Sequence, residues 1–168
     1  REIVPGAVDV GLLVNPTGTL AEVQVKEAKE AAQKLGQRIH VANAGSQGEI
    51  DAAFAAMKVG ALVVGLDPIF ATLRTQIISL AARNRIPTVY GVREYCDLGG
   101  LASYGASVSG SWSQAALYVT RILKGEKPGD LPVMQPAKFE LVINLKTAKA
   151  LNLSIARSLI ARADDVIE

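Results

Sequence analysis

The sequence predicts an α/β fold built on a doubly wound parallel sheet. Short apolar segments alternate with amphipathic segments of helical periodicity between residues 7 and 90, and turn residues separate them. Ala, Val, Leu and Ile dominate, whereas Phe, Trp and Tyr number only three, one and four. Because right-handed crossovers join strands through helices, this alternation is typical of parallel strands sandwiched between helices.

The first strand and helix have clear boundaries. Ala7–Val14 is a β-like apolar run that ends in the turn Asn15–Thr19. We expect Leu20–Leu35 to be a helix because apolar residues recur on one face and Gly36 can close it. Arg38–Ala42 then forms a second short strand.

The next two strands follow the same plan. Ser46 and Glu49 match a capping box, so we expect a helix over Gln47–Val59. The continuous apolar run Ala61–Leu66 predicts a strand buried on both faces. We then expect a helix over Ile69–Asn84 and a strand over Pro87–Tyr90.

The second half of the chain is less regular. We expect strands over two segments and helices over four, none of them part of a repeat. The strands are Leu101–Tyr104 and Phe139–Asn144, and the helices are Arg93–Leu98, Ser111–Leu123, Thr147–Leu151 and Ala156–Ala163.

Polar side chains follow three of the predicted strands, where a parallel sheet binds its ligands. Asn15 and Thr17 follow the first strand, Asp67 follows the third with the apolar Pro68 beside it, and Tyr90 ends the fourth strand before Arg93 and Glu94. These seven residues are our ligand-binding candidates.

Their chemistry fits a zwitterion such as an amino acid. Thr17 and Gly18 would lie near a helix N-terminus, where N–H groups attract a carboxylate. Asp67 and Glu94 could bind an ammonium group, and Tyr90 could supply an apolar wall.

Each candidate also has an ordinary structural explanation. Asn15–Pro16 and Asp67–Pro68 are common turn and N-cap pairs. Tyr90 could be a core residue at a strand end, and Arg93 with Glu94 could be a solvated surface pair. The grouping of the candidates favours the functional interpretation more than any single residue does.

The sequence offers no catalytic device. His40 is the only histidine and lies within a short strand, and acidic neighbours disfavour a reactive thiolate at Cys96. Nucleotide-binding glycine loops and the G-x-S-x-G elbow are missing, and one cysteine permits no CxxC metal set. We therefore expect no enzyme, no cofactor and no metal.

Charge and hydropathy argue against two further classes, nucleic-acid-binding proteins and membrane-spanning proteins. The 18 basic and 16 acidic residues are spread along the chain without a basic stripe, so we expect no nucleic-acid partner. The apolar runs are far shorter than the ~20 residues that span a bilayer. The chain begins at Arg1 without a signal peptide, and we expect processing or design to have removed the original start.

Several strings together resemble one family over essentially the whole chain. The most specific is Leu131–Leu151, read with the tail Ala161–Glu168. With four shorter strings upstream, it resembles the C-terminal half of ABC transporter substrate-binding proteins of the tryptophan/tyrosine-importer type. The shorter strings are Val14–Pro16, Leu66–Pro68, Tyr90–Tyr95 and Gly99–Gly105.

This resemblance implies one lobe of a type I periplasmic-binding fold and an extracytoplasmic, periplasmic location. Two lobes would close on a small organic solute, an aromatic amino acid or a related compound, and dock on a membrane permease. Residues 1–98 and 133–168 would form the C-terminal lobe. Residues 99–132 would be a hinge crossing and a segment of the missing N-terminal lobe, with hinges at Tyr90–Glu94 and Gly99–Gly100. The resemblance also adds Tyr104 to the ligand-binding candidates.

The resemblance also bears on partners. The helix ending at Leu123 would lack the N-terminal lobe as its partner, so the isolated chain would form a dimer or a swapped dimer through that apolar face. The alternative function is the ligand-sensing effector domain of a regulator, which shares this fold. A third class is a flavodoxin-like or hydrolase-type enzyme. This sequence lacks the phosphate loop or the nucleophile elbow that such an enzyme would need.

Overall fold

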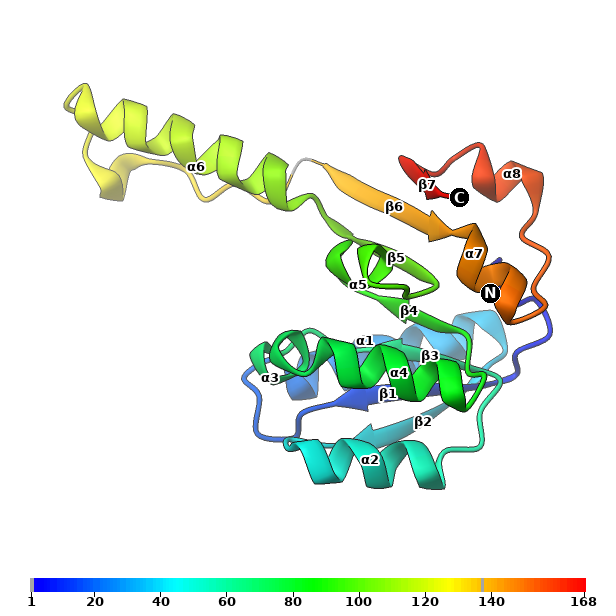
Figure 1. Cartoon of the computed structure of the whole chain (residues 1–168). Coiled ribbons are helices and arrows are strands. Elements are labelled where there is room, and N and C mark those ends of the chain that lie inside the picture. Colours follow the sequence, from blue (N-terminus) through cyan, green and yellow to red (C-terminus); the bar gives the residue numbers. More distant parts are fainter. Residues whose placement is uncertain (1, 137) are drawn as a thin grey trace.

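A computed structural model describes residues 2–136 and 138–168, in which seven strands form one sheet (Figure 1). The strand order is β2-β1-β3-β4-β5-β6-β7. All neighbouring pairs are parallel except β5 and β6, which are antiparallel. The strands are β1 Asp9–Val14, β2 Arg38–Asn43, β3 Ala61–Val64, β4 Thr88–Tyr90, β5 Ala102–Ala106, β6 Phe139–Asn144 and β7 Asp165–Ile167.

Helices connect the parallel strands and cover both faces, which confirms the predicted fold class. The antiparallel β5–β6 pair makes the sheet mixed, a feature that the sequence pattern did not predict. The helices are α1 Ala21–Leu35, α2 Gln47–Ala56, α3 Pro68–Thr72, α4 Arg74–Arg83, α5 Glu94–Asp97, α6 Val108–Leu123, α7 Leu145–Ala150 and α8 Arg157–Ile160, with a 3₁₀ turn at Pro128–Asp130.

The helix expected over Ile69–Asn84 is two helices, α3 and α4, that meet at Leu73. The backbone of Leu73 leaves the helical region, with φ −96° and ψ 18°. The helix expected to reach Val59 also stops early, because Met57 is extended. Neither position carries Gly or Pro, so the local sequence gave no signal for these breaks.

Strand β7, which has three residues, was not predicted. It lies beside β6, and a reciprocal pair of hydrogen bonds fixes its start. The Asp164 N–H donates to the Leu141 carbonyl, and the Leu141 N–H donates to the Asp164 carboxylate, both at 2.9 Å.

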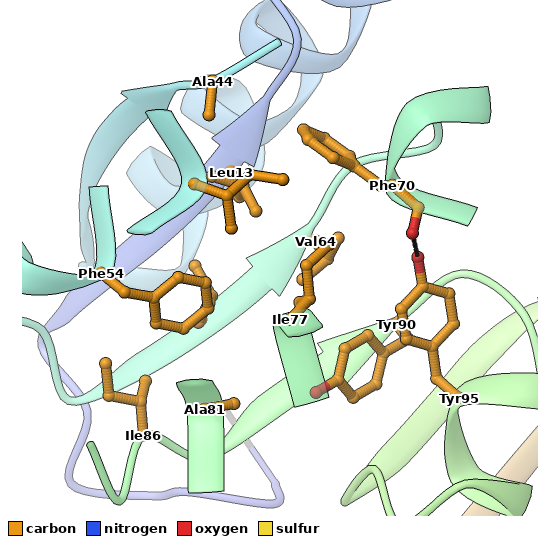
Figure 2. Close-up of a cluster of buried hydrophobic side chains, with 12 residues drawn as sticks. Leu13, Ala44, Phe54, Val64, Phe70, Ile77, Ala81, Ile86, Tyr90 and Tyr95 are labelled. Carbon is orange, nitrogen blue, oxygen red and sulfur yellow. Dashed lines mark hydrogen bonds between the residues drawn. The ribbon is translucent and has the colours of Figure 1, made fainter. Parts of the chain in front are cut away.

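The larger core cluster centres on β1, β3, β4 and the helices α2 and α4 (Figure 2). Phe54, Phe70 and Ile77 are almost completely buried there. The Tyr95 hydroxyl donates to the Phe70 carbonyl at 2.8 Å, which ties α5 to α3. This packing fixes the loops that follow β3 and β4.

Helix α6 projects away from the sheet together with the connector that follows it (Figure 1). None of its residues is buried, and Trp112 and Leu123 are 72% and 81% exposed. At the base, Ala102 and Ser103 of β5 pair with β4 and are buried. The start of the predicted 99–132 segment therefore lies within this sheet, and the assignment of the remainder to another lobe stays a prediction.

Candidate functional site

The carboxyl ends of β1 and β3 bring Asn15 and Asp67 together. These strands are neighbours in the sheet although the two residues are 52 positions apart. Asn15 Nδ2 donates to Asp67 Oδ2 at 3.1 Å, and Asp67 Oδ1 accepts the Ile69 N–H at 2.9 Å as the N-cap of α3. Both side chains are half-buried.

Two glycines permit this close arrangement. A Cβ on Gly18 would lie 2.4 Å from Asp67 Oδ2, and a Cβ on Gly45 would lie 2.9 Å from Asn15 Oδ1. Any side chain at either position would therefore push against the pair. The turns after β1 and β2 thus keep the space around it free of side chains.

Thr17 joins the pair through Asn15. Its N–H and its hydroxyl both donate to Asn15 Oδ1, at 3.2 and 2.9 Å. The Gly18 N–H donates to the Asn15 carbonyl at 3.0 Å. Both N–H groups therefore bond within the turn that precedes α1, which begins at Ala21. The expectation that N–H groups at the N-terminus of this helix attract a ligand carboxylate stays a prediction.

An apolar hollow of ≈ 270 Å³ lies beside this polar group. Asp67 and Pro68 belong to its lining, so the polar group meets the hollow through Asp67. Gln24 of α1 fixes one wall by accepting the Leu66 N–H at 2.6 Å and donating to the Leu66 carbonyl at 3.2 Å. The apolar side chains lining the hollow are Leu20, Val64, Leu66, Pro68, Ala71, Val92 and Tyr95.

Tyr95, rather than Tyr90, lines the hollow, and it is itself only 4% exposed. Tyr90 is only 2% exposed and stacks on Tyr95 with ring centroids 4.4 Å apart (Figure 2). Burial raises the pKa of Tyr95 to about 12 and raises the pKa of Tyr90 as well. Tyr90 thus lies behind the wall for which it was proposed.

Arg93 points to β6 and β7. Its guanidinium lies 2.8 Å from the Asp165 carboxylate, 3.5 Å from Asp97 and 3.8 Å from Glu140. Asp165, with help from Asp97, raises the pKa of Arg93, which therefore stays charged. The structure gives this side chain a role in holding α5 against the β6–β7 edge.

The two remaining candidates lie away from the hollow. Glu94 is exposed on α5. Tyr104 is 59% exposed on β5 and stacks on Phe139 of β6, with ring centroids 5.8 Å apart. The structure therefore groups Asn15, Thr17, Asp67 and Pro68, and it separates Tyr90, Arg93, Glu94 and Tyr104 from them.

Sequence reasoning missed Gln24, Leu66 and Tyr95. Tyr95 and Leu66 belong to strings that carried the family resemblance, and that was their only available signal. Gln24 lies in the first turns of an amphipathic helix, where a polar residue is ordinary. Its role depends on a contact 42 residues away, which no local pattern reveals.

The family described as ABC transporter substrate binding protein matches residues 1–167. A curated relative, the tyrosine-binding protein of Clostridioides difficile (strain R20291), is 23% identical over 155 residues. The match covers 91% of this chain and 45% of the relative. The chain therefore spans about half the length of this curated relative.

Solved structures show the same fold. A conserved domain protein from Vibrio cholerae has a TM-score of 0.89 at 28% identity, covering 98% of this chain and 56% of its own. An ABC domain in complex with L-Trp from Streptococcus pneumonia has a TM-score of 0.89 at 27% identity. The match covers 99% of this chain and 58% of that one. A LacI family regulator from Bifidobacterium animalis, at 14% identity and a TM-score of 0.62, shows the fold alone.

Proposed function

Because this chain belongs to the family of ABC transporter substrate binding proteins, as its sequence resemblance predicted, we propose that it captures a solute for an importer. The full-length protein binds a small organic solute in a cleft, and this chain supplies one wall. One observation carries the proposal: the half-buried Asp67 carboxylate, which Asn15 holds in place, lines an apolar hollow. Polar groups at the edge of an apolar cavity are typical of small-molecule sites.

The solute class follows from the same two features. The Asp67 carboxylate suits an ammonium group, and the hollow of ≈ 270 Å³ suits an apolar or aromatic side chain. An amino acid with such a side chain combines both. The L-Trp bound to one structural neighbour and the name of the tyrosine-binding relative support this class.

The other wall belongs to a second lobe that we place in the rest of the full-length protein. The relatives' greater length leaves room for one. In this proposal residues 1–98 and 133–168 form the C-terminal lobe, and β5 and β6 lead out of it toward α6. Lobe closure buries the solute, with hinges at Tyr90–Glu94 and Gly99–Gly100.

We also propose that the protein works outside the cytoplasm and delivers its solute to a membrane permease. Family membership supports both points. Within residues 2–136 and 138–168, no helix has the length and hydrophobicity needed to cross a membrane.

Titration calorimetry of the full-length protein with L-Trp and L-Tyr tests the proposal. Asp67→Asn removes the charge but keeps a side-chain oxygen that can cap α3, so the fold is preserved. We expect affinity to fall ~10-fold or more, since hydrogen bonds to charged groups contribute about 1.5–3 kcal/mol. Glu27→Gln, at an exposed position on α1, is the control and leaves the affinity unchanged.

Glu94 is tested in parallel, because it was the second carboxylate assigned to the ammonium group. Glu94→Ala should weaken binding only if lobe closure brings this exposed side chain to the solute. Undiminished affinity in both Asp67→Asn and Glu94→Ala would refute the assignment of the ammonium site to this wall.

A further inference from the structure

We propose that Tyr95 is a positioning residue for the solute site. Its hydroxyl keeps α3 separate from α4 and thereby holds the Asp67 carboxylate at the hollow. The inference deepens the proposed function and rests on it, because Asp67 is the group assigned there to the ammonium of the solute.

The break between α3 and α4 changes the partners of the backbone carbonyls. The last carbonyls of a helix have no donor within that helix and need one from elsewhere. In α3, the Ile69 carbonyl accepts the Leu73 N–H at 2.9 Å. The next carbonyl, that of Phe70, accepts the Tyr95 hydroxyl at 2.8 Å (Figure 2). A side chain of α5 therefore takes a place that a backbone N–H fills in an unbroken helix.

The Tyr95 hydrogen bond makes this break favourable. In a continuous helix the Phe70 carbonyl would accept the N–H of Arg74, four residues later. At a break, a buried carbonyl without a donor is costly, so a side chain must supply one. The neighbouring Ala71 carbonyl accepts from the Arg74 guanidinium at 2.6 Å, which is a bond within the α3–α4 unit itself. Tyr95 is thus the donor through which another element, α5, sets the break.

The Tyr95 side chain has a fixed position. Its ring stacks on that of Tyr90, with centroids 4.4 Å apart and planes 15° from parallel. The Gly100 N–H donates to the Tyr95 carbonyl at 2.7 Å, and a Cβ on Gly100 would lie 2.7 Å from that oxygen. Burial raises the pKa of the hydroxyl to about 12, so it keeps its proton and donates at neutral pH. The donor is therefore in place before a solute arrives.

The position of Asp67 depends on that of Phe70, because the residues on either side of Phe70 both bond to Asp67. The Ile69 N–H donates to Asp67 Oδ1 at 2.9 Å, and the Ala71 N–H donates to the Asp67 carbonyl at 3.2 Å. Without the Tyr95 hydroxyl, the Phe70 carbonyl would turn toward α4 for a donor. That turn would rotate α3 and carry the Asp67 carboxylate away from the hollow.

Titration calorimetry of the full-length protein with two probes tests the inference. L-Trp carries an ammonium group, and indolepropionate is the same molecule without it. Tyr95→Phe removes the hydroxyl and keeps the ring. We expect this variant to bind L-Trp ~5-fold or more weakly, because the charged contact at Asp67 is misplaced. Its affinity for indolepropionate should stay within ~2-fold of the native value, because the apolar hollow remains. Equal weakening of both probes would overturn the inference.

A double-mutant cycle and a destabilised control separate positioning from stability. If Tyr95 acts through Asp67, adding Tyr95→Phe to Asp67→Asn should weaken L-Trp binding by less than ~2-fold further. Full additivity of the two losses would contradict the inference. Gln37→Ala removes the hydrogen bond to the Ala7 carbonyl at 2.8 Å, at the opposite edge of the sheet from the hollow. This control should lose stability and keep its affinity for L-Trp.

Hydrogen exchange in the solute-free, full-length protein tests the positioning without any ligand. The Ile69 N–H reports on Asp67, because it donates to the carboxylate. We expect Tyr95→Phe to speed its exchange ~10-fold or more, whereas Gln37→Ala leaves the rate unchanged. If L-Trp fails to bind even the native protein, the proposed function fails and this measurement alone decides the role of Tyr95. An unchanged exchange rate in Tyr95→Phe, or the same increase in both variants, would refute that role.

Discussion

Asp67 performs two structural tasks with one carboxylate. Oδ1 caps α3 and Oδ2 accepts from Asn15, so the group is oriented before any solute arrives. Preorganised acceptors lose little entropy on binding. In the proposed site, this orientation would let a turn residue that also satisfies ordinary N-cap chemistry serve as a binding group.

Tyr95 links the wall of the hollow to the core, and Tyr95→Phe tests that link. The change removes the hydroxyl that donates to the Phe70 carbonyl at 2.8 Å. Because the acceptor stays buried, we expect the free energy of unfolding to fall by about 1–3 kcal/mol, measured by urea denaturation. Tyr104→Phe, at a 59% exposed position, is the control and should cost much less. Equal losses of unfolding free energy in the two variants would show that the Tyr95 hydrogen bond adds no stability.

Cys96 gives the protein a predictable alkaline sensitivity. Burial raises the pKa of its thiol from 9.0 to about 11. The thiol of the unfolded chain loses its proton first, so the free energy of unfolding should decline as pH rises through this interval. Urea denaturation at several pH values should show a shallower decline in Cys96→Ala than in the native chain. Parallel declines would rule out this thiol as the cause.

At the scale of elements, N-caps position several helices. The Ser46 hydroxyl accepts the Glu49 N–H at 3.4 Å, as the predicted capping box requires. Glu49 departs from that motif, because its carboxylate accepts the Gly45 N–H at 2.7 Å rather than that of Ser46. The signal still located the start of α2 correctly.

Asn144 caps α7 from inside the core, and Asn144→Ala should be more damaging than Ser46→Ala. Asn144 Oδ1 accepts the Thr147 N–H at 3.0 Å, and Nδ2 donates to the Cys96 carbonyl at 3.2 Å. Ser46→Ala should cost about 1 kcal/mol of unfolding free energy. Asn144→Ala should cost about 2–4 kcal/mol, because it also leaves the Cys96 carbonyl without its side-chain donor. Equal losses in thermal or urea unfolding would contradict this.

At the scale of the whole molecule, α6 exposes a large apolar surface. Leu117, Val119 and Leu123 are 65%, 55% and 81% exposed. Exposed apolar patches of this kind mark surfaces that bind another protein surface. In the full-length protein we assign that partner to the second lobe.

The isolated chain should therefore associate with itself through α6. Size-exclusion chromatography with light scattering should show dimers or larger species at micromolar concentration. The double variant Leu117→Glu and Leu123→Glu should return the chain to a monomer, whereas Val23→Glu on α1 should not. A well-folded, strictly monomeric native chain would count against a missing partner for α6.

The sequence by itself determined the α/β class, the alternation of the first four strands with helical segments, and the family. Hydrophobic periodicity, turn residues and capping motifs are local signals, and they locate elements such as α1 and α2 well. They also predicted ligand-binding residues in the loops after β1 and β3, and that assignment stays a prediction.

Only the tertiary structure decided which candidates meet. Asn15 and Asp67 meet because β1 and β3 are neighbours, whereas Arg93 turns to Asp165, 72 residues away. The role of Gln24 depends equally on a distant contact, with Leu66. Such contacts arise from packing between elements, and the packing energy of a side chain is not encoded in its local neighbours.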